Sequence, residues 1–148
     1  MAIGDITIFN EARATMLDGG WESADTIKLA LITSTTVPTQ ADVTPVLGDY
    51  TQVTAGGNYT AGGEALDSWG NMITQSAGTV TFDDTGASVS WAQHASNPTN
   101  ARYGIFYNDT DTAGPDSAIG FIDLGSTIDM TTGDLTITWN ASGIFTIS

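Results

Sequence analysis

The sequence predicts an all-β protein: an antiparallel β-sandwich or jelly-roll-like domain with a short N-terminal helix. Short segments of alternating apolar and polar residues recur along the chain, each bounded by Gly, Asn, Asp or Pro. No long helical pattern separates them, and this spacing is typical of sandwiches and jelly rolls. The 148 residues match the common size of one domain. With 41% hydrophobic and 14% charged residues the chain is too apolar for intrinsic disorder, so we expect one β-sandwich domain over residues 1–148.

The first element is a short helix within an N-terminal arm, residues 1–20. The segment Ile8 to Leu17 (IFNEARATML) places its apolar residues near helical spacing, and Gly19 and Gly20 follow as a stop signal. The residues near helical spacing are Phe9, Ala12, Met16 and Leu17.

A core strand and a long loop come next. The segment Asp25 to Ser34 (DTIKLALITS) alternates with the period of a strand, and we expect one face of it to be much more buried than the other. Residues 35–63 hold prolines, glycines and many threonines, which predicts a long loop with at most one short strand. Loops of this length are usually functional or anchored to a partner, so we expect residues 35–63 to form a contact surface or an arm.

Further strands follow at regular spacing. Val80 and Phe82 alternate in one run and Val89 and Trp91 in the next, and the turn-forming residues 84–86 between them predict a hairpin. The remaining predicted strands are ARYGIFYND from Ala101, IGFIDL from Ile119, DLTITWN with Leu135, Ile137 and Trp139, and IFTI from Ile144 to Ile147.

Charge and composition exclude several classes of function. Three Lys and Arg against 17 Asp and Glu give a formal net charge of -14, so neither nucleic acid nor an anionic membrane is an expected partner. The absence of Cys excludes disulfides and thiolate sites, and a single histidine, His94, leaves zinc and most acid/base chemistry short of residues. We find no signal-peptide pattern and no apolar run long enough for a membrane span, so we expect a soluble protein without an export signal. These observations favour a binding or structural role, with no enzymatic activity and no cofactor.

The best metal-binding candidate is the acidic segment 108–116 (NDTDTAGPD). Asp109 and Asp111 fall at positions one and three of a calcium loop, and Asp116 lies close behind them. Position five is Ala113 and position twelve is Gly120, so the pattern is only half satisfied. A polar turn between two strands explains the same residues, and we favour that interpretation.

Aromatic residues are the candidate partner-binding residues. Trp91 and Trp139 follow strand alternation and are expected in the core. Trp21 and Trp69 lie beside glycines and are expected at a contact surface, together with Tyr50 and Tyr59 in the long loop.

Catalytic patterns are weak. A glycosidase needs two carboxylates at a fixed separation, and although acids are abundant, none lies in a recognisable catalytic motif. His94 has no G-x-S-x-G nucleophile elbow to serve, and we expect it in an exposed loop. The pairs Gly56-Gly57 and Gly62-Gly63 are not followed by lysine, which excludes a phosphate cradle.

Several phrases in order resemble a family of small virion proteins of tailed bacteriophages. They are IKLALITS from Ile27, NYTAGGEAL from Asn58, ARYGIFYNDT from Ala101, IGFIDLG from Ile119 and GDLTITWNASGIFTIS from Gly133. The resemblance spans nearly the whole chain and brings no catalytic residues.

The resemblance and the small size imply a capsid decoration or cement protein. Such a protein would bind the major capsid protein on the outer surface of the capsid in the virion, as a homo-oligomer and by preference a trimer. Two alternatives from other classes stay open: a tail-associated adhesin that binds receptor glycans through exposed aromatics, and a small glycan hydrolase with paired carboxylates.

Overall fold

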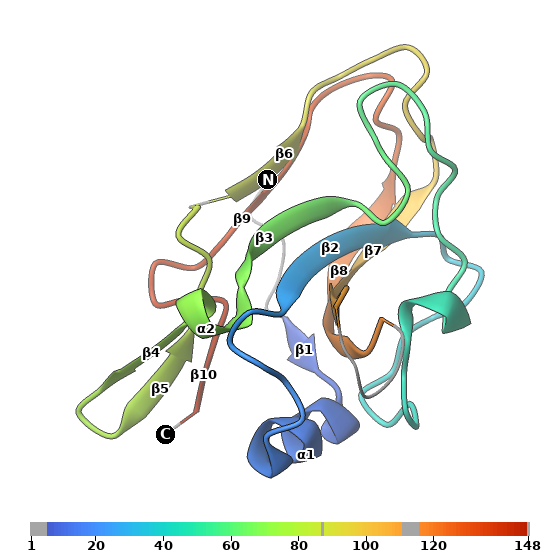
Figure 1. Cartoon of the computed structure of the whole chain (residues 1–148). Helices are drawn as coiled ribbons and strands as arrows, with labels where there is room; N and C mark the ends of the chain where they lie inside the picture. The colour runs from blue at the N-terminus through green and yellow to red at the C-terminus, as the bar shows by residue number, and fades with distance from the viewer. Residues whose placement is uncertain (1–5, 87, 111–115, 148) are drawn as a thin grey trace.

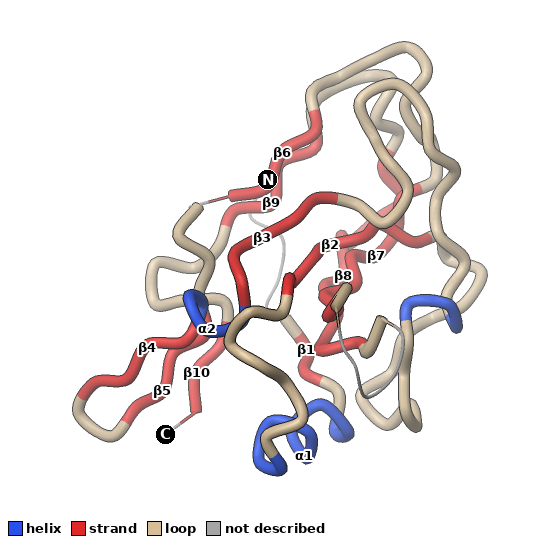
Figure 2. Tube along the Cα trace, viewed as in Figure 1, coloured by secondary structure: helices blue, strands red, loops and turns tan. Residues whose placement is uncertain are grey.

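The computed structural model describes residues 6–86, 88–110 and 116–147. Its described residues are dominated by antiparallel strands, with two short α-helices and one 3-10 helix (Figure 1, Figure 2). The all-β prediction is confirmed. In this part of the chain the strands form a five-stranded, a three-stranded and a two-stranded sheet.

The five-stranded sheet forms the centre of the molecule. Its strands are β1 (Thr7–Ile8), β2 (Thr26–Ile32), β3 (Glu64–Ser68), β7 (Ala101–Asn108) and β8 (Ala118–Ile128). Their order is β1-β8-β7-β2-β3, and every neighbouring pair is antiparallel.

The predicted core strand is β2, but both of its faces are buried at the C-terminal end. All residues from Leu29 to Ile32 are fully buried. β3 begins at Glu64, opposite Leu29, so it covers only the N-terminal part of β2. Beyond Leu29 the long loop lies beside β2 instead. The N–H of Val53 donates to the carbonyl of Leu31 over 3.1 Å, and Ile32 forms an isolated bridge with Gln52.

The predicted hairpin between residues 80 and 91 is wrong. The three-stranded sheet contains β4 (Ile73–Ser76), β5 (Thr79–Phe82) and β10 (Phe145–Ile147), and β5 turns back on β4. The turn between β4 and β5 is formed by Ala77 and Gly78, which both have positive φ, as tight hairpin turns require. This hairpin projects from the body of the molecule (Figure 1).

The second half of that expected hairpin pairs with a distant strand. β6 (Ser88–Trp91) forms the two-stranded sheet with β9 (Leu135–Thr138). Val89 lies opposite Ile137 and Trp91 opposite Leu135, so the apolar residues of both strands share one buried face. The burial of these side chains outweighs the local preference of residues 84–86 for a tight hairpin turn.

The N-terminal helix is confirmed as α1 (Asn10–Asp18). It ends at Gly19, whose left-handed φ of 69° forms the C-cap, as the glycine pair predicts. Phe9 and Ala12 are buried, whereas Leu17 is 87% exposed and is not part of the core. The second helix, α2 (Trp69–Met72), is one turn long and connects β3 to β4. No described helix has the length and apolar character that crossing a bilayer requires.

The two segments expected to be arms are packed onto the domain in their described parts, residues 6–20 and 35–63. The long loop contains the 3-10 helix η1 (Leu47–Asp49) and buries Leu47, Tyr50, Val53 and Tyr59. Backbone hydrogen bonds fix it to the region before β8, from Leu47 N–H to the carbonyl of Asp116 and from Ala118 N–H to that of Pro45. The N-terminal segment pairs through β1 with β8 and inserts Phe9 into the core. Apolar burial explains both corrections.

Candidate functional site

The four aromatic residues expected at a contact surface are buried, which corrects that expectation. Exposed fractions are 7% for Trp21, 9% for Trp69, 5% for Tyr50 and 2% for Tyr59. Trp21 and Trp69 meet edge to face with ring centroids 4.7 Å apart, and Trp69 also packs against Phe82. The adjacent glycines allow close approach of neighbouring segments: a Cβ at Gly20 would lie 2.7 Å from Cγ2 of Thr15, and one at Gly70 would lie 2.7 Å from Cβ of Ser23.

The two tyrosines hold the long loop in place through their hydroxyl groups. The hydroxyl of Tyr50 donates to Oδ2 of Asp42 over 2.8 Å, and burial together with this carboxylate raises the Tyr50 pKa. The hydroxyl of Tyr59 accepts a hydrogen bond from the N–H of Leu31 over 2.9 Å. Burial raises the pKa of Tyr59 to about 12.

Of the two tryptophans expected in the core, one is fully buried. Trp91 is 1% exposed, as predicted. Trp139 follows β9 and is half-buried. Its ring lies 5.5 Å from that of Phe106, and its Nε1–H donates to Oδ2 of Asp84 over 3.3 Å.

The acidic segment after β7 binds a lysine within the chain. Oδ2 of Asp109 lies 2.7 Å from Nζ of Lys28. Asp116 is half-buried, and this burial, together with the charge of Asp109, raises its pKa. Asp111 lies outside the described residues. The described residues contain no group of three or more metal-ligating side chains, so the geometry does not add to the half-satisfied calcium pattern.

His94 lies in an exposed loop, as predicted, and takes part in the loop's own turn. Its Nδ1 accepts a hydrogen bond from the N–H of Ser96 over 3.0 Å. The neighbouring Asn97 is buried and ties three segments together. Its Nδ2 donates to the carbonyls of Ala92 and Met130, and its Oδ1 accepts from the N–H of Asn58. This arrangement stabilises the loop and resembles no catalytic pairing.

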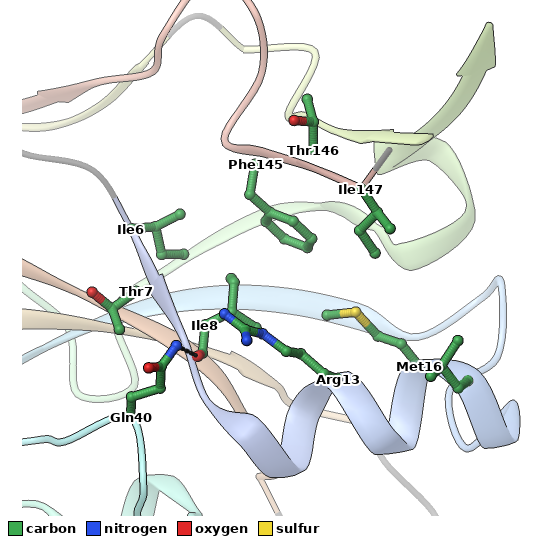
Figure 3. Close-up of a pocket in the computed structure, with 10 residues that line it drawn as sticks. Ile6, Thr7, Ile8, Arg13, Met16, Gln40, Phe145, Thr146 and Ile147 are labelled. Atoms are coloured by element: carbon green, nitrogen blue, oxygen red, sulfur yellow. Dashed lines mark hydrogen bonds between the residues drawn. The ribbon is translucent and has the colours of Figure 1, made fainter. Parts of the chain in front are cut away.

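The strongest candidate site is an apolar groove between α1, β1 and β10, with a volume of about 810 Å³. We call it the α1–β10 groove. Arg13 and Met16 project from the helix into the space in which Phe145 and Ile147 lie (Figure 3). The residues that line the groove are Ile6, Thr7, Ile8, Arg13, Met16, Leu17, Gln40, Phe145, Thr146 and Ile147.

One wall of the groove belongs to an apolar face of the three-stranded sheet. Directly paired residues of neighbouring strands share a face of the sheet. One such set on this face is Gln75, Val80 and Ile147. The set two positions further along the strands is Ile73, Phe82 and Phe145. The opposite face carries Thr and Ser at each paired position. The inner end of the apolar face joins the core, where the rings of Phe82 and Phe145 stack with centroids 4.6 Å apart. Its outer end is open, and Ile147 is 51% exposed.

The charge of the groove differs from that of the whole chain. The described residues that line it include one cation, Arg13, and no Asp or Glu. The other two cations form ion pairs, Lys28 with Asp109 and Arg102 with Asp123. Arg13 forms no ion pair with a described residue. The described part of the groove therefore combines apolar walls with a guanidinium group that pairs with no described carboxylate.

Sequence reasoning missed this groove because its walls come from the two ends of the described chain. Ile6 to Leu17 and Phe145 to Ile147 become neighbours only when β1 joins β8 and β10 joins β5. The available signal was Leu17, an apolar residue outside the narrow buried face of α1. No protein family model, no curated protein and no solved structure matches this chain.

Proposed function

We propose that this chain is a structural protein of a tailed-bacteriophage virion that binds the outer surface of the capsid as a decoration or cement protein. The observation that carries the proposal is the open α1–β10 groove on a domain that buries the aromatic residues expected at a contact surface. Leu17 and Ile147 are exposed at this groove. Two exposed apolar side chains that line the same groove favour an interaction site at this place. The resemblance of the sequence to small virion proteins supplies the partner, the major capsid protein.

The way the loops are fixed suits a protein that holds capsomers together against the pressure of packaged DNA. The long loop is fixed to β2 through Val53 and Tyr59 and to the start of β8 through Leu47. A clamp transmits force only if its connecting segments do not yield, because slack in a loop absorbs displacement. Packed loops and a closely hydrogen-bonded sheet supply that stiffness.

The acidic surface is consistent with a location outside the shell. A formal net charge of -14 repels DNA and complements basic patches on a shell protein. We propose a homo-oligomer, preferably a trimer, on the resemblance alone, because decoration proteins often sit at local three-fold positions of a shell.

The α1–β10 groove favours neither alternative. The adhesin rests on exposed Trp21 and Trp69, and both are buried. The glycan hydrolase rests on paired carboxylates in a cleft, and the described lining residues of this groove include no Asp or Glu. We therefore carry neither forward as a second function.

Gold-antibody labelling of purified virions from the parent phage tests the proposal. Particles are scored separately over the head, the tail tip and the background, with virions of a strain lacking the gene as the control. We expect label distributed over the head. Label confined to the tail tip, or none above background, would refute a role on the capsid.

A further inference from the structure

We propose that the α1–β10 groove binds an extended segment of a partner protein, with apolar side chains at alternate positions and one carboxylate opposite Arg13. The segment pairs with the open edge of β10. The identity of the partner as a shell protein rests on the proposed function, whereas the chemistry of the segment rests on the groove itself.

The walls of the groove require apolar side chains. Ile6, Ile8 and Met16 line one side, and Phe145 and Ile147 line the other. Leu17, at 87% exposure, is the most exposed large apolar residue described. Covering these side chains removes apolar surface from water, which favours binding of an apolar segment.

The adjoining sheet edge requires an extended backbone. β10 is hydrogen-bonded to β5 on one side, and no described strand pairs with its other side. An unpaired edge presents N–H and C=O groups that another strand can satisfy. A strand added here places every second side chain on the apolar face that holds Phe145 and Ile147. The alternation of the bound segment follows from this geometry.

Arg13 requires an anion. Among the described residues it is the cation that forms no ion pair with another described residue, and the described lining residues of the groove include no Asp or Glu. A guanidinium group binds a carboxylate through two parallel hydrogen bonds, and its affinity rises where apolar walls exclude water. Acids elsewhere on the surface repel a carboxylate, but salt screens their effect beyond about 8 Å.

A second copy of this chain is a poorer occupant than a different protein. A two-fold contact through this groove would bring the Arg13 residues of both copies into one interface, and the described lining residues offer no Asp or Glu to pair with either. A segment of a different protein needs only one acidic residue to supply that carboxylate, and the proposed homo-oligomer forms through another surface.

Peptide binding to the full-length protein tests the chemistry. The probe is a fluorescein-labelled ten-residue peptide in which Val and Thr alternate around one central Glu, measured by fluorescence polarisation beside its Gln and Lys counterparts. We expect saturable binding in the order Glu, Gln, Lys. Arg13→Gln should weaken the Glu peptide about tenfold and leave the Gln peptide unchanged. Leu17→Ser should weaken both.

Matched controls separate the groove from general effects of charge and hydrophobicity. Arg102→Gln removes the same charge from a residue that does not line the groove, and Val43→Ser removes a 78% exposed apolar side chain from the long loop. We expect neither to alter peptide binding. Because Leu17 is highly exposed, Leu17→Ser should retain the melting temperature of the wild type.

Several outcomes overturn the inference. The first is that the Glu peptide does not bind at concentrations up to about 1 mM. The second is that Arg13→Gln weakens the Glu and Gln peptides equally. The third is that the wild type sediments as a dimer that Leu17→Ser dissociates, which would make a second copy the occupant.

Binding to heads that lack the protein separates the two proposals. Heads that bind Leu17→Ser as tightly as wild type refute the groove and leave the capsid role standing. Peptide binding as predicted without head binding supports the groove and refutes the capsid role.

Discussion

Replacing Tyr59 with Phe tests whether the long loop is an anchored part of the domain. The hydroxyl group of Tyr59 accepts the N–H of Leu31 over 2.9 Å and lies 3.4 Å from the carbonyl of the same residue. Both residues are buried, at 2% and 0% exposure. Tyr59→Phe keeps the ring and removes the acceptor, so the buried N–H of Leu31 loses its partner. An orphaned buried donor costs about 1 to 3 kcal/mol.

Urea unfolding followed by tryptophan fluorescence measures this cost. We expect the midpoint to fall at an unchanged m-value, because the same surface is exposed on unfolding. Tyr103→Phe is the matched control: this residue is also buried, and no hydrogen bond of its hydroxyl is found among the described residues. It should change stability by less than about 0.5 kcal/mol. If Tyr59→Phe is as stable as the wild type, the loop is not held to β2 by this contact and the anchored-loop description is wrong.

Three further predictions concern the other parts of the fold. Phe9→Ala removes a fully buried ring that packs against Tyr50, and should cost about 3 to 5 kcal/mol in urea unfolding; a loss below 1 kcal/mol would show that the N-terminal segment is a free arm. Ala77→Asn places a residue that tolerates positive φ in the β4–β5 turn and should raise stability by about 1 kcal/mol, with Ser76→Asn as the control expected to give no gain. Asp116→Asn removes a carboxyl whose pKa is raised in the folded state above its ordinary value of 3.8, so the folded state is penalised at neutral pH. This variant should be more stable than wild type at pH 7 by less than about 1 kcal/mol. The gain should vanish in thermal melts at a pH below the pKa of the unfolded state, where both forms of the protein are protonated at this position. A variant that is less stable than wild type at pH 7 would contradict burial as the cause of the raised pKa.

The elements predicted best are those fixed by local residues. Gly19 ends α1 because only a residue that adopts positive φ at low cost fits its cap, and this requirement is visible in the sequence. The alternation from Thr26 to Ile32 identified β2 because a period of two is a property of the strand itself. The all-β class followed from many such local signals. Its arrangement as a sandwich or jelly roll stays a prediction.

Pairings between distant segments could not be predicted in the same way. The turn residues after Phe82 favour a hairpin, but Val89 and Trp91 gain more burial opposite Ile137 and Leu135. These partners lie far apart in the sequence, so a local pattern cannot indicate that they pair. Tyr50 and Tyr59 were expected on a contact surface because they lie in a loop, and the structure shows that a loop rich in Thr and Gly can still bury its aromatics.

The α1–β10 groove was invisible to the sequence for a related reason. Arg13 is unremarkable until the remaining cations are found paired with Asp109 and Asp123. The sequence predicts that Ile147 lies in a strand, but its exposure depends on how β10 is placed relative to α1, which the sequence does not reveal.

The thermal stability of heads tests the central claim most directly. Heads from a strain that lacks the gene are heated with and without purified protein, and DNA release is followed by a dye that cannot enter intact heads. The cement function predicts that wild-type protein raises the release temperature and that the double variant Arg13→Gln, Leu17→Ser raises it less. An identical release temperature with and without the wild-type protein would contradict the claim that this chain stabilises the capsid.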